Sequence, residues 1–209
     1  MGRRRRSAGG GFNRSNDFIL GLTYTNIVQF TTLQEVLASA LGVDIGPYTH
    51  ISTSLHLYED DPIAARLLAR PADPVDLYMW VTPQPMAAWD DDGWTELRAL
   101  VEIGTRPVSP IADGWLAGVS CPYWNSVARM LRAWHWLKVP ELRPHEALLH
   151  ALDELDHPTM VAQDWRLAAL EYLWRWSSRR GVGELVYQYS KGQGWPDAAL
   201  AWILHDDLR

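Results

Sequence analysis

Apolar residues recur at helical spacing shortly after the beginning of the chain. Between residues 26 and 41 they stand three or four positions apart, and Gly42 follows where a helix would end. This stripe consists of Phe30, Leu33, Leu37 and Leu41. The pattern predicts a helix over residues 26–41 whose apolar stripe is buried.

The period changes to two between residues 48 and 58, which is typical of a strand. One face then carries phenol, imidazole and hydroxyl groups, from Tyr48, His50, Ser52, Ser54, His56 and Tyr58. The other face is largely apolar, with Thr49, Ile51, Thr53, Leu55 and Leu57. Surface strands usually turn Lys, Glu or Thr outward, so this polar face favours a strand that lines a polar cleft. A polar row that simply faces solvent is the alternative.

Helical patterns dominate the rest of the chain. A helix is predicted from Asp61, since Pro62 suits a first turn, and a short strand over residues 76–81 precedes a loop over residues 82–92. Later helices are predicted over residues 95–103, 122–137, 144–155, 158–178 and 196–204, and four of them open with proline. These elements predict an α+β fold whose C-terminal part is largely helical.

The aromatic composition supports a tightly packed C-terminal part. The chain has 12 tryptophans against 3 phenylalanines, and all the tryptophans follow Pro74. We expect these rings to pack on one another or on a partner chain. With 209 residues and 47% hydrophobic residues, the chain can form one globular domain or slightly more.

Charge argues against nucleic acid as a partner. The net charge of −6 does not favour the broad basic face that phosphate-backbone binding needs. Arginines at residues 3–6 are followed by Ser7, Ala8 and three glycines, a composition that buries little apolar surface. We therefore expect a flexible, solvated tail over residues 1–12 and one domain over residues 13–209.

The cysteine content and the hydropathy of the chain indicate the cellular compartment of the protein. Cys121 is the single cysteine, which excludes an internal disulfide and a thiolate-rich metal cluster, and no metal site is expected. No stretch approaches the roughly 20 apolar residues of a membrane span. The sequence thus predicts a cytoplasmic protein that does not enter a membrane.

The segment over residues 14–26 combines groups suited to a nucleotide. It reads Arg-Ser-Asn-Asp-Phe-Ile-Leu-Gly-Leu-Thr-Tyr-Thr-Asn and runs into the first predicted helix. Arg14 offers a planar fork of donors for a phosphate, and Ser15 adds a hydroxyl. Asn26 both donates and accepts, which matches the carbonyl and N–H of a uracil edge.

This order of residues resembles the thymidylate synthase family. An Arg-Ser-x-Asp motif is followed by a glycine, an aromatic residue, an asparagine and a helix with Gln and Glu. A strand that ends in His-x-Tyr, here His56-Leu57-Tyr58, completes the pattern at a similar spacing. The form Arg-Ser-Asn-Asp is most similar to phage and bacterial relatives. The resemblance implies a mixed sheet with packed helices.

The resemblance also implies roles for individual residues. Arg14 and Ser15 would bind the 5′-phosphate of a pyrimidine deoxynucleoside monophosphate, and Asn26 would read the base. The remaining contacts would come from His56 and Tyr58, to the 3′-hydroxyl, and from Asp17 and Gly21, to the cofactor 5,10-methylenetetrahydrofolate. Asparagine at position 26 favours uracil, because deoxycytidylate hydroxymethylases resemble this family but have an acid there. A homodimer formed through the sheet is implied as well.

A nucleophile for this chemistry is not identifiable. The family uses a thiolate upstream of the Arg-Ser-x-Asp motif, in a Pro-Cys segment, whereas the 13 residues before Arg14 contain no cysteine. Cys121 lies beyond the motif and before an apolar helix, which favours a structural thiol. We therefore expect a truncated chain or a second polypeptide that carries the nucleophile. A non-catalytic nucleotide-binding or assembly module and a deoxypyrimidine hydroxymethylase-like enzyme are the alternatives.

Overall fold

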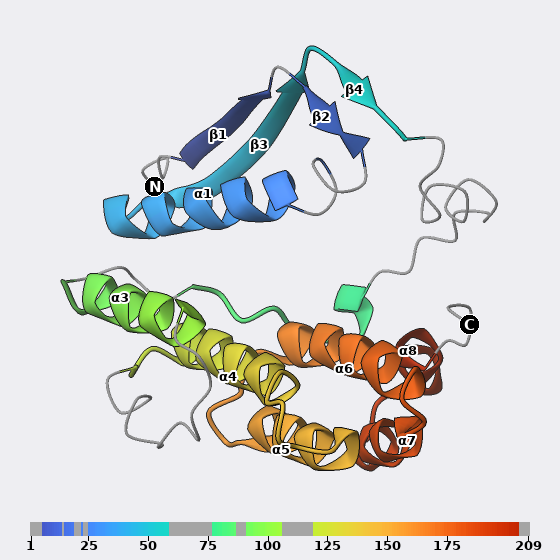
Figure 1. The fold of residues 1–209 in the computed structure, drawn as a ribbon. Helices are drawn as coiled ribbons and strands as arrows, with labels where there is room; N and C mark the ends of the chain where they lie inside the picture. Colours follow the sequence, from blue (N-terminus) through green and yellow to red (C-terminus); the bar gives the residue numbers. More distant parts are fainter. Residues whose placement is uncertain are drawn as a thin grey trace. The chain divides into compact units, whose positions relative to one another are not determined.

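A computed structural model describes residues 6–13, 15–18, 22, 25–58, 77–86, 91–105 and 119–204. The chain divides into two compact units. The first, here called the sheet unit, comprises residues up to 75 with residues 88–90, and the second, the helical unit, comprises residues 76–87 and 91–209. One domain was predicted over residues 13–209, and the boundary between the two units falls within this range. The α+β class is confirmed (Figure 1).

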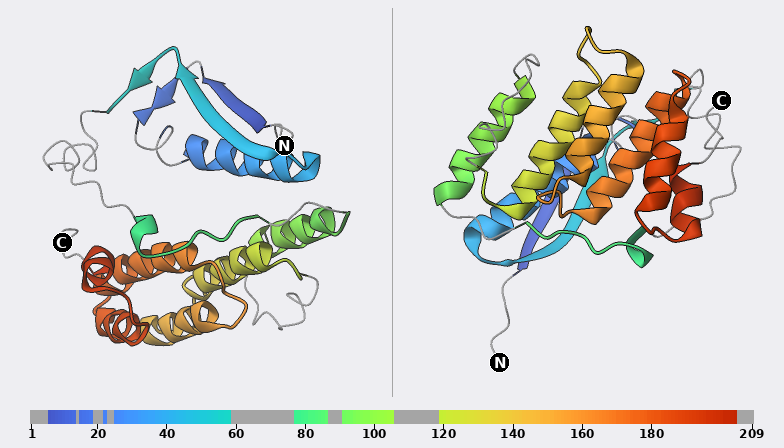
Figure 2. Two further views of the ribbon diagram at one scale, coloured as in Figure 1. Left: turned by 180° about the vertical axis from the view of Figure 1, so that it is seen from behind. Right: turned by 90° about the horizontal axis from the view of Figure 1, so that it is seen from below.

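Two pairs of parallel strands and one helix form the sheet unit. Strand β1 (Arg6–Asn13) pairs with β3 (Asp44–Ser52), and β2 (Asn16–Asp17) pairs with β4 (Leu55–His56). Parallel neighbours need a crossover connection, and helix α1 (Ile27–Leu41) provides it. In each view α1 lies along β1 and β3 (Figures 1 and 2).

The prediction of a flexible tail over residues 1–12 is wrong for residues 6–12, because these residues form part of β1. Glycine makes the strand possible because it lets α1 approach closely. A Cβ at Gly9 would lie 2.7 Å from Oε1 of Gln34, a buried side chain of α1. Residues 1–5 lie outside the described part of the chain.

Gln34 ties the two strands together. Its Nε2 donates to the carbonyl oxygens of Ser7 in β1, at 3.3 Å, and of Gly46 in β3, at 2.9 Å. The register shifts between Ser7 and Gly9, so β3 carries a bulge at this point. Pro47 is tolerated in the strand because a bulge does not need its missing N–H.

Helix α1 forms as predicted, but a different face of it is buried. It spans Ile27–Leu41 and ends at Gly42, whose φ of 63° is left-handed. The buried residues are Gln34, Val36 and Ala38, whereas the predicted stripe is largely exposed at Leu33, Leu37 and Leu41. Gly9 of β1 leaves room for the side chain of Gln34.

The single strand predicted over residues 48–58 is confirmed only in part, because it divides into β3, which pairs with β1, and β4, which pairs with β2. The exposure of its faces was also not predicted. In β3 the side chains of Tyr48, His50 and Ser52 are partly buried, and alternating residues are exposed. Tyr48 stacks against Phe30 of α1, with ring centroids 6.3 Å apart. The apolar face is the exposed one, including Phe12, Ile45, Ile51 and Leu55.

Six helices and one short 3₁₀ turn make up the described part of the helical unit. They are η2 (Leu77–Met79), α3 (Asp91–Thr105), α4 (Pro122–Trp136), α5 (Pro144–Asp156), α6 (Gln163–Ser178), α7 (Gly183–Gly192) and α8 (Asp197–Ile203). The strand predicted over residues 76–81 is wrong, since η2 lies there. α6 begins five residues later than predicted, and α7 was not predicted. The helix predicted from Asp61 lies outside the described residues.

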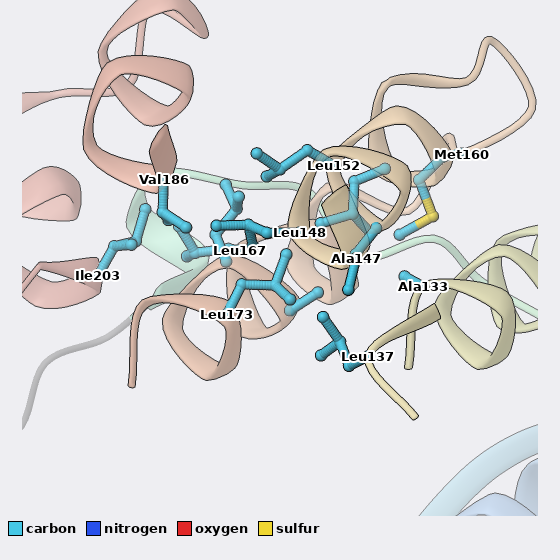
Figure 3. Packing of buried hydrophobic residues seen from close by; sticks show 14 of the residues in the cluster. Ala133, Leu137, Ala147, Leu148, Leu152, Met160, Leu167, Leu173, Val186 and Ile203 are labelled. Atoms are coloured by element: carbon cyan, nitrogen blue, oxygen red, sulfur yellow. The ribbon is translucent and has the colours of Figure 1, made fainter. Parts of the chain in front are cut away.

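The core of the helical unit is aliphatic. Leu148, Leu155, Leu167 and Leu170 are fully buried between α5 and α6. Figure 3 shows side chains from α5, α6, α7 and α8 pointing toward one another. Six tryptophans are partly buried and pack against this core: Trp80, Trp136, Trp165, Trp174, Trp176 and Trp195. The indoles therefore surround aliphatic side chains, and some also meet other rings, as Trp136 does with His150 at 4.3 Å.

A buried ionic cluster joins α4 to α5. The carboxylate of Glu154 accepts from Arg129 Nη1 and from Arg132 Nε, each at 2.7 Å, and all three side chains are at most 7% exposed. Trp136 Nε1 also donates to Glu154, at 3.2 Å, and Arg129 Nη2 lies 3.0 Å from His157 Nε2. One carboxylate thus holds two guanidinium groups inside the unit.

Candidate functional site

The two motifs singled out in the sequence meet in the sheet unit. Strand β2 carries the end of the Arg-Ser-x-Asp motif and β4 carries the beginning of His-x-Tyr, and the strands pair in parallel. Asp17 stands opposite His56 in the register, and the Asn16 N–H donates to the Ser54 carbonyl oxygen at 2.8 Å. Residues about 40 positions apart in sequence are therefore adjacent in space.

Asn26 lies immediately before α1 and faces the same motif. Its backbone is helical, with φ −70° and ψ −44°, and its side chain does not cap the helix. Instead Asn26 Nδ2 donates to Asn16 Oδ1 at 2.9 Å. The amide is thus held in place by a residue inside the Arg-Ser-x-Asp motif.

The other predicted site residues differ in their contacts and in their burial. His56 and Tyr58 meet edge to face, with ring centroids 5.1 Å apart and planes at 83°. Ser15 is exposed and Asp17 is half-buried. Arg14 and Gly21 lie outside the described residues, so their predicted roles are left as predictions.

A hydrogen-bond network beside Asn26 was missed by the sequence analysis. His50 Nε2 lies 2.9 Å from Asn16 Nδ2 and 3.3 Å from Asn13 Nδ2, and His50 Nδ1 lies 2.9 Å from the Tyr48 hydroxyl. Asn16 is buried, with 3% of its surface exposed. The alternation over residues 48–58 placed Tyr48 and His50 on one face, which was the available signal.

Cys121 has a structural position. It precedes the first turn of α4 in the helical unit, whereas the described residues of the predicted nucleotide site lie in the sheet unit. The buried carboxylate of Glu96 accepts from the Cys121 N–H at 3.1 Å and from the N–H and hydroxyl of Ser120, each at 2.7 Å. These hydrogen bonds hold the segment that directly precedes α4, and they involve the Cys121 backbone and not its thiol.

Within the described ranges, no group of three or more His, Cys, Asp or Glu side chains is arranged to hold a metal ion. None of the helices in the same ranges has the length and apolar character needed to cross a membrane.

Comparison with known proteins agrees with the two motifs. The family model for thymidylate synthase matches residues 11–84, which include β1 to β4 and α1. Residues 11–84 are thus similar to the thymidylate synthase family. The resemblance inferred from Arg-Ser-x-Asp and His-x-Tyr is thereby confirmed, although the matched residues stop before the six helices of the helical unit.

Two phage proteins are similar to this chain. A "Deoxyuridylate hydroxymethyltransferase" of Pseudomonas phage M6 is 29% identical over 181 residues, covering 78% of this chain and 46% of the relative. A protein of the same name from Bacillus phage SP01 is 48% identical over 50 residues, covering 24% of this chain and 13% of the relative. The chain thus spans about half the length of the first relative and less of the second. No solved structure gives a significant match.

Proposed function

We propose that this chain binds deoxyuridylate and takes part in folate-dependent transfer of one carbon to carbon 5 of the base. The observation that carries the proposal is the pairing of β2 with β4, in which Asp17 stands opposite His56. This pairing brings together the motif that would bind the phosphate and the motif that would bind the sugar. Both phage relatives are named for hydroxymethyl transfer to deoxyuridylate, which favours hydroxymethyl over methyl as the transferred group.

The nucleotide would be held at three points. Arg14 and Ser15 would bind the 5′-phosphate, and His56 with Tyr58 would bind the 3′-hydroxyl. Asn26 would read the base, and its contact with Asn16 supports this role. One N–H of the Asn26 amide donates to Asn16, so the other N–H and Oδ1 form a single edge that matches the O4 and N3–H of uracil.

Among the described residues, Asp17 has the chemistry to bind the cofactor 5,10-methylenetetrahydrofolate. Asp17 is a half-buried carboxylate next to the sugar-binding strand, and a carboxylate accepts hydrogen bonds from the N–H groups of a pterin. We propose that Asp17 orients the pterin and that Gly21 allows its close approach. When bound, the folate supplies the one-carbon unit.

The thiolate that activates carbon 6 would come from outside the described site. Cys121 directly precedes α4 and its backbone N–H is bound by Glu96, so we assign its thiol no chemical role. A polypeptide segment with a reactive cysteine would have to complete the centre. A non-catalytic nucleotide-binding module is the second candidate, favoured by the same position of Cys121.

Replacing Asn26 with aspartate should reverse the base preference. Wild type is expected to bind deoxyuridylate more tightly than deoxycytidylate, since cytosine presents an acceptor at N3 and donors at N4. Asn26→Asp should weaken deoxyuridylate binding by about 1.5 to 3 kcal/mol, measured by calorimetry. Arg14→Ala is the matched control, because it should weaken both nucleotides alike. Equal affinities for the two nucleotides in wild type would remove the base-reading role.

We also propose that the exposed apolar side of the sheet forms a homodimer. Phe12, Ile45 and Ile51 are each more than half exposed on the paired strands β1 and β3, and such a patch is costly to leave in water. Ile51→Lys should therefore convert a dimer to a monomer in sedimentation velocity. Leu149→Lys, at an exposed leucine of α5, is the matched control and should leave the sedimentation unchanged. A monomeric wild type would contradict this proposal.

A further inference from the structure

The buried side of β3 contains a continuous path of hydrogen bonds to the residue that would read the base. It runs from the Tyr48 hydroxyl to His50 Nδ1, from His50 Nε2 to Asn16 Nδ2, and from Asn16 Oδ1 to Asn26 Nδ2, with each step 2.9 Å long. The path connects β3 and β2 to the start of α1. None of its first three members belongs to the predicted nucleotide contacts.

The direction of this path follows from the donors around His50. Its Nε2 is approached by amide nitrogens of both Asn16 and Asn13, and amide nitrogens only donate. Nε2 must therefore accept, so the neutral ring carries its proton on Nδ1 and donates to Tyr48 Oη. Asn16 then has its Nδ2 toward His50, which leaves Oδ1 toward Asn26.

Tyr48 is held so that it can serve as this partner. Its ring stacks on Phe30 of α1 at 6.3 Å. On the other side, Gly11 of β1 leaves the space that the hydroxyl occupies, because a Cβ at this position would collide with the Tyr48 oxygen and lie 3.4 Å from His50 Nδ1. The strand and the helix thus fix the phenol against the imidazole.

The structure assigns His50 a positioning role: through Asn16, its Nδ1–H tautomer fixes the orientation of the Asn26 amide and thereby selects uracil over cytosine. If the path ran in the opposite direction, Asn16 would present Nδ2 to Asn26, and the Asn26 amide would turn over. Its edge would then place N–H where Oδ1 had been, which matches cytosine N3 and N4. This inference rests on the proposed base-reading role of Asn26.

The tautomer can be measured without any nucleotide. Nitrogen-15 spectra of the full chain, with the His50 signals assigned by their loss in His50→Gln, should show a protonated Nδ1 and an unprotonated Nε2. In Asn26→Asp the carboxylate accepts only, so Asn16 should turn over. Asn13 should turn over with it, because its Nδ2 also faces His50 Nε2, and the proton should move to Nε2. A wild-type Nε2–H tautomer, or a tautomer unchanged in Asn26→Asp, would overturn the inference even if no nucleotide binds.

Nucleotide selectivity provides the second readout. His50→Leu removes the acceptor for Asn16, so the ratio of deoxyuridylate to deoxycytidylate affinity should fall about tenfold, the worth of one hydrogen bond. His50→Gln retains an acceptor and should restore part of the ratio. In the Asn26→Asp background His50→Leu should not change the ratio, since a carboxylate has two equal ends. An unchanged ratio in His50→Leu alone, with wild type still selective, would contradict the role of His50 while leaving that of Asn26 intact.

Discussion

Tritium at carbon 5 of labelled deoxyuridylate should be released only when a polypeptide with the Pro-Cys segment is added to this chain and methylenetetrahydrofolate. Release requires a thiolate at carbon 6, which makes carbon 5 a carbanion able to attack the one-carbon unit. The 209-residue chain has one cysteine, and the contact with Glu96 that precedes α4 uses its backbone N–H and not its thiol. The chain alone should therefore release no tritium above a blank.

Asp17 provides the control within the reconstituted pair. Asp17→Ala should lower the rate of release roughly 10²-fold, because a misplaced folate puts the one-carbon unit out of reach of carbon 5. Nucleotide affinity should be nearly unchanged. Release by the chain alone that disappears in Cys121→Ser would show that our structural assignment of Cys121 is wrong. A pair that never releases tritium but binds deoxyuridylate would favour the non-catalytic module.

Replacing Glu154 with glutamine should destabilise the helical unit by about 3 to 5 kcal/mol, because the carboxylate that two buried guanidinium groups share is then lost. Its contacts with Arg129 and Arg132 are each 2.7 Å long, and water cannot solvate the charges left behind. Small domains have only about 5 to 15 kcal/mol of stability, so the unit should be close to unfolding. Urea titration followed by tryptophan fluorescence measures the change, since Trp136 donates to Glu154.

Glu146→Gln on the same helix is the matched control. Glu146 pairs with Arg143 at 2.7 Å, and a hydrogen bond from the Arg143 side chain lowers the pKa of the Glu146 carboxyl to about 2. Water screens this pair, because 81% of the Arg143 side chain is exposed. The urea midpoint should barely move. Equal effects of the two substitutions would mean that burial of the Glu154 cluster contributes nothing.

The elements with strong local signals could be predicted from the sequence. The spacing of apolar residues and Gly42 located α1, and proline at the first position located α4 and α5. Helix α7 was not predicted, because it is short and because it begins at Gly183 and ends at Gly192, and glycines usually indicate turns. Periodicity also gave the correct alternation of β3.

Which faces are buried could not be predicted, because that depends on partners distant in sequence. The leucine stripe of α1 is the more apolar side, yet Gln34 faces the strands since glycines in β1 leave space for it. The candidate site shows the same limit. The motifs indicated Asn26 and His56, but the contact of His50 with Asn16 depends on the bulged register of β3 and on the pairing of β2, which no local pattern encodes.

The three consecutive glycines of β1 differ in how readily each could be replaced in evolution. A Cβ at position 9 would meet Gln34 and one at position 11 would meet the Tyr48 hydroxyl, whereas a Cβ at position 10 meets only the Thr49 carbonyl oxygen, at 3.8 Å. Substitutions can accumulate at Gly10 alone. At Gly9 and Gly11 they become acceptable only together with changes at Gln34 and Tyr48, so these two pairs should covary as the lineage diverges.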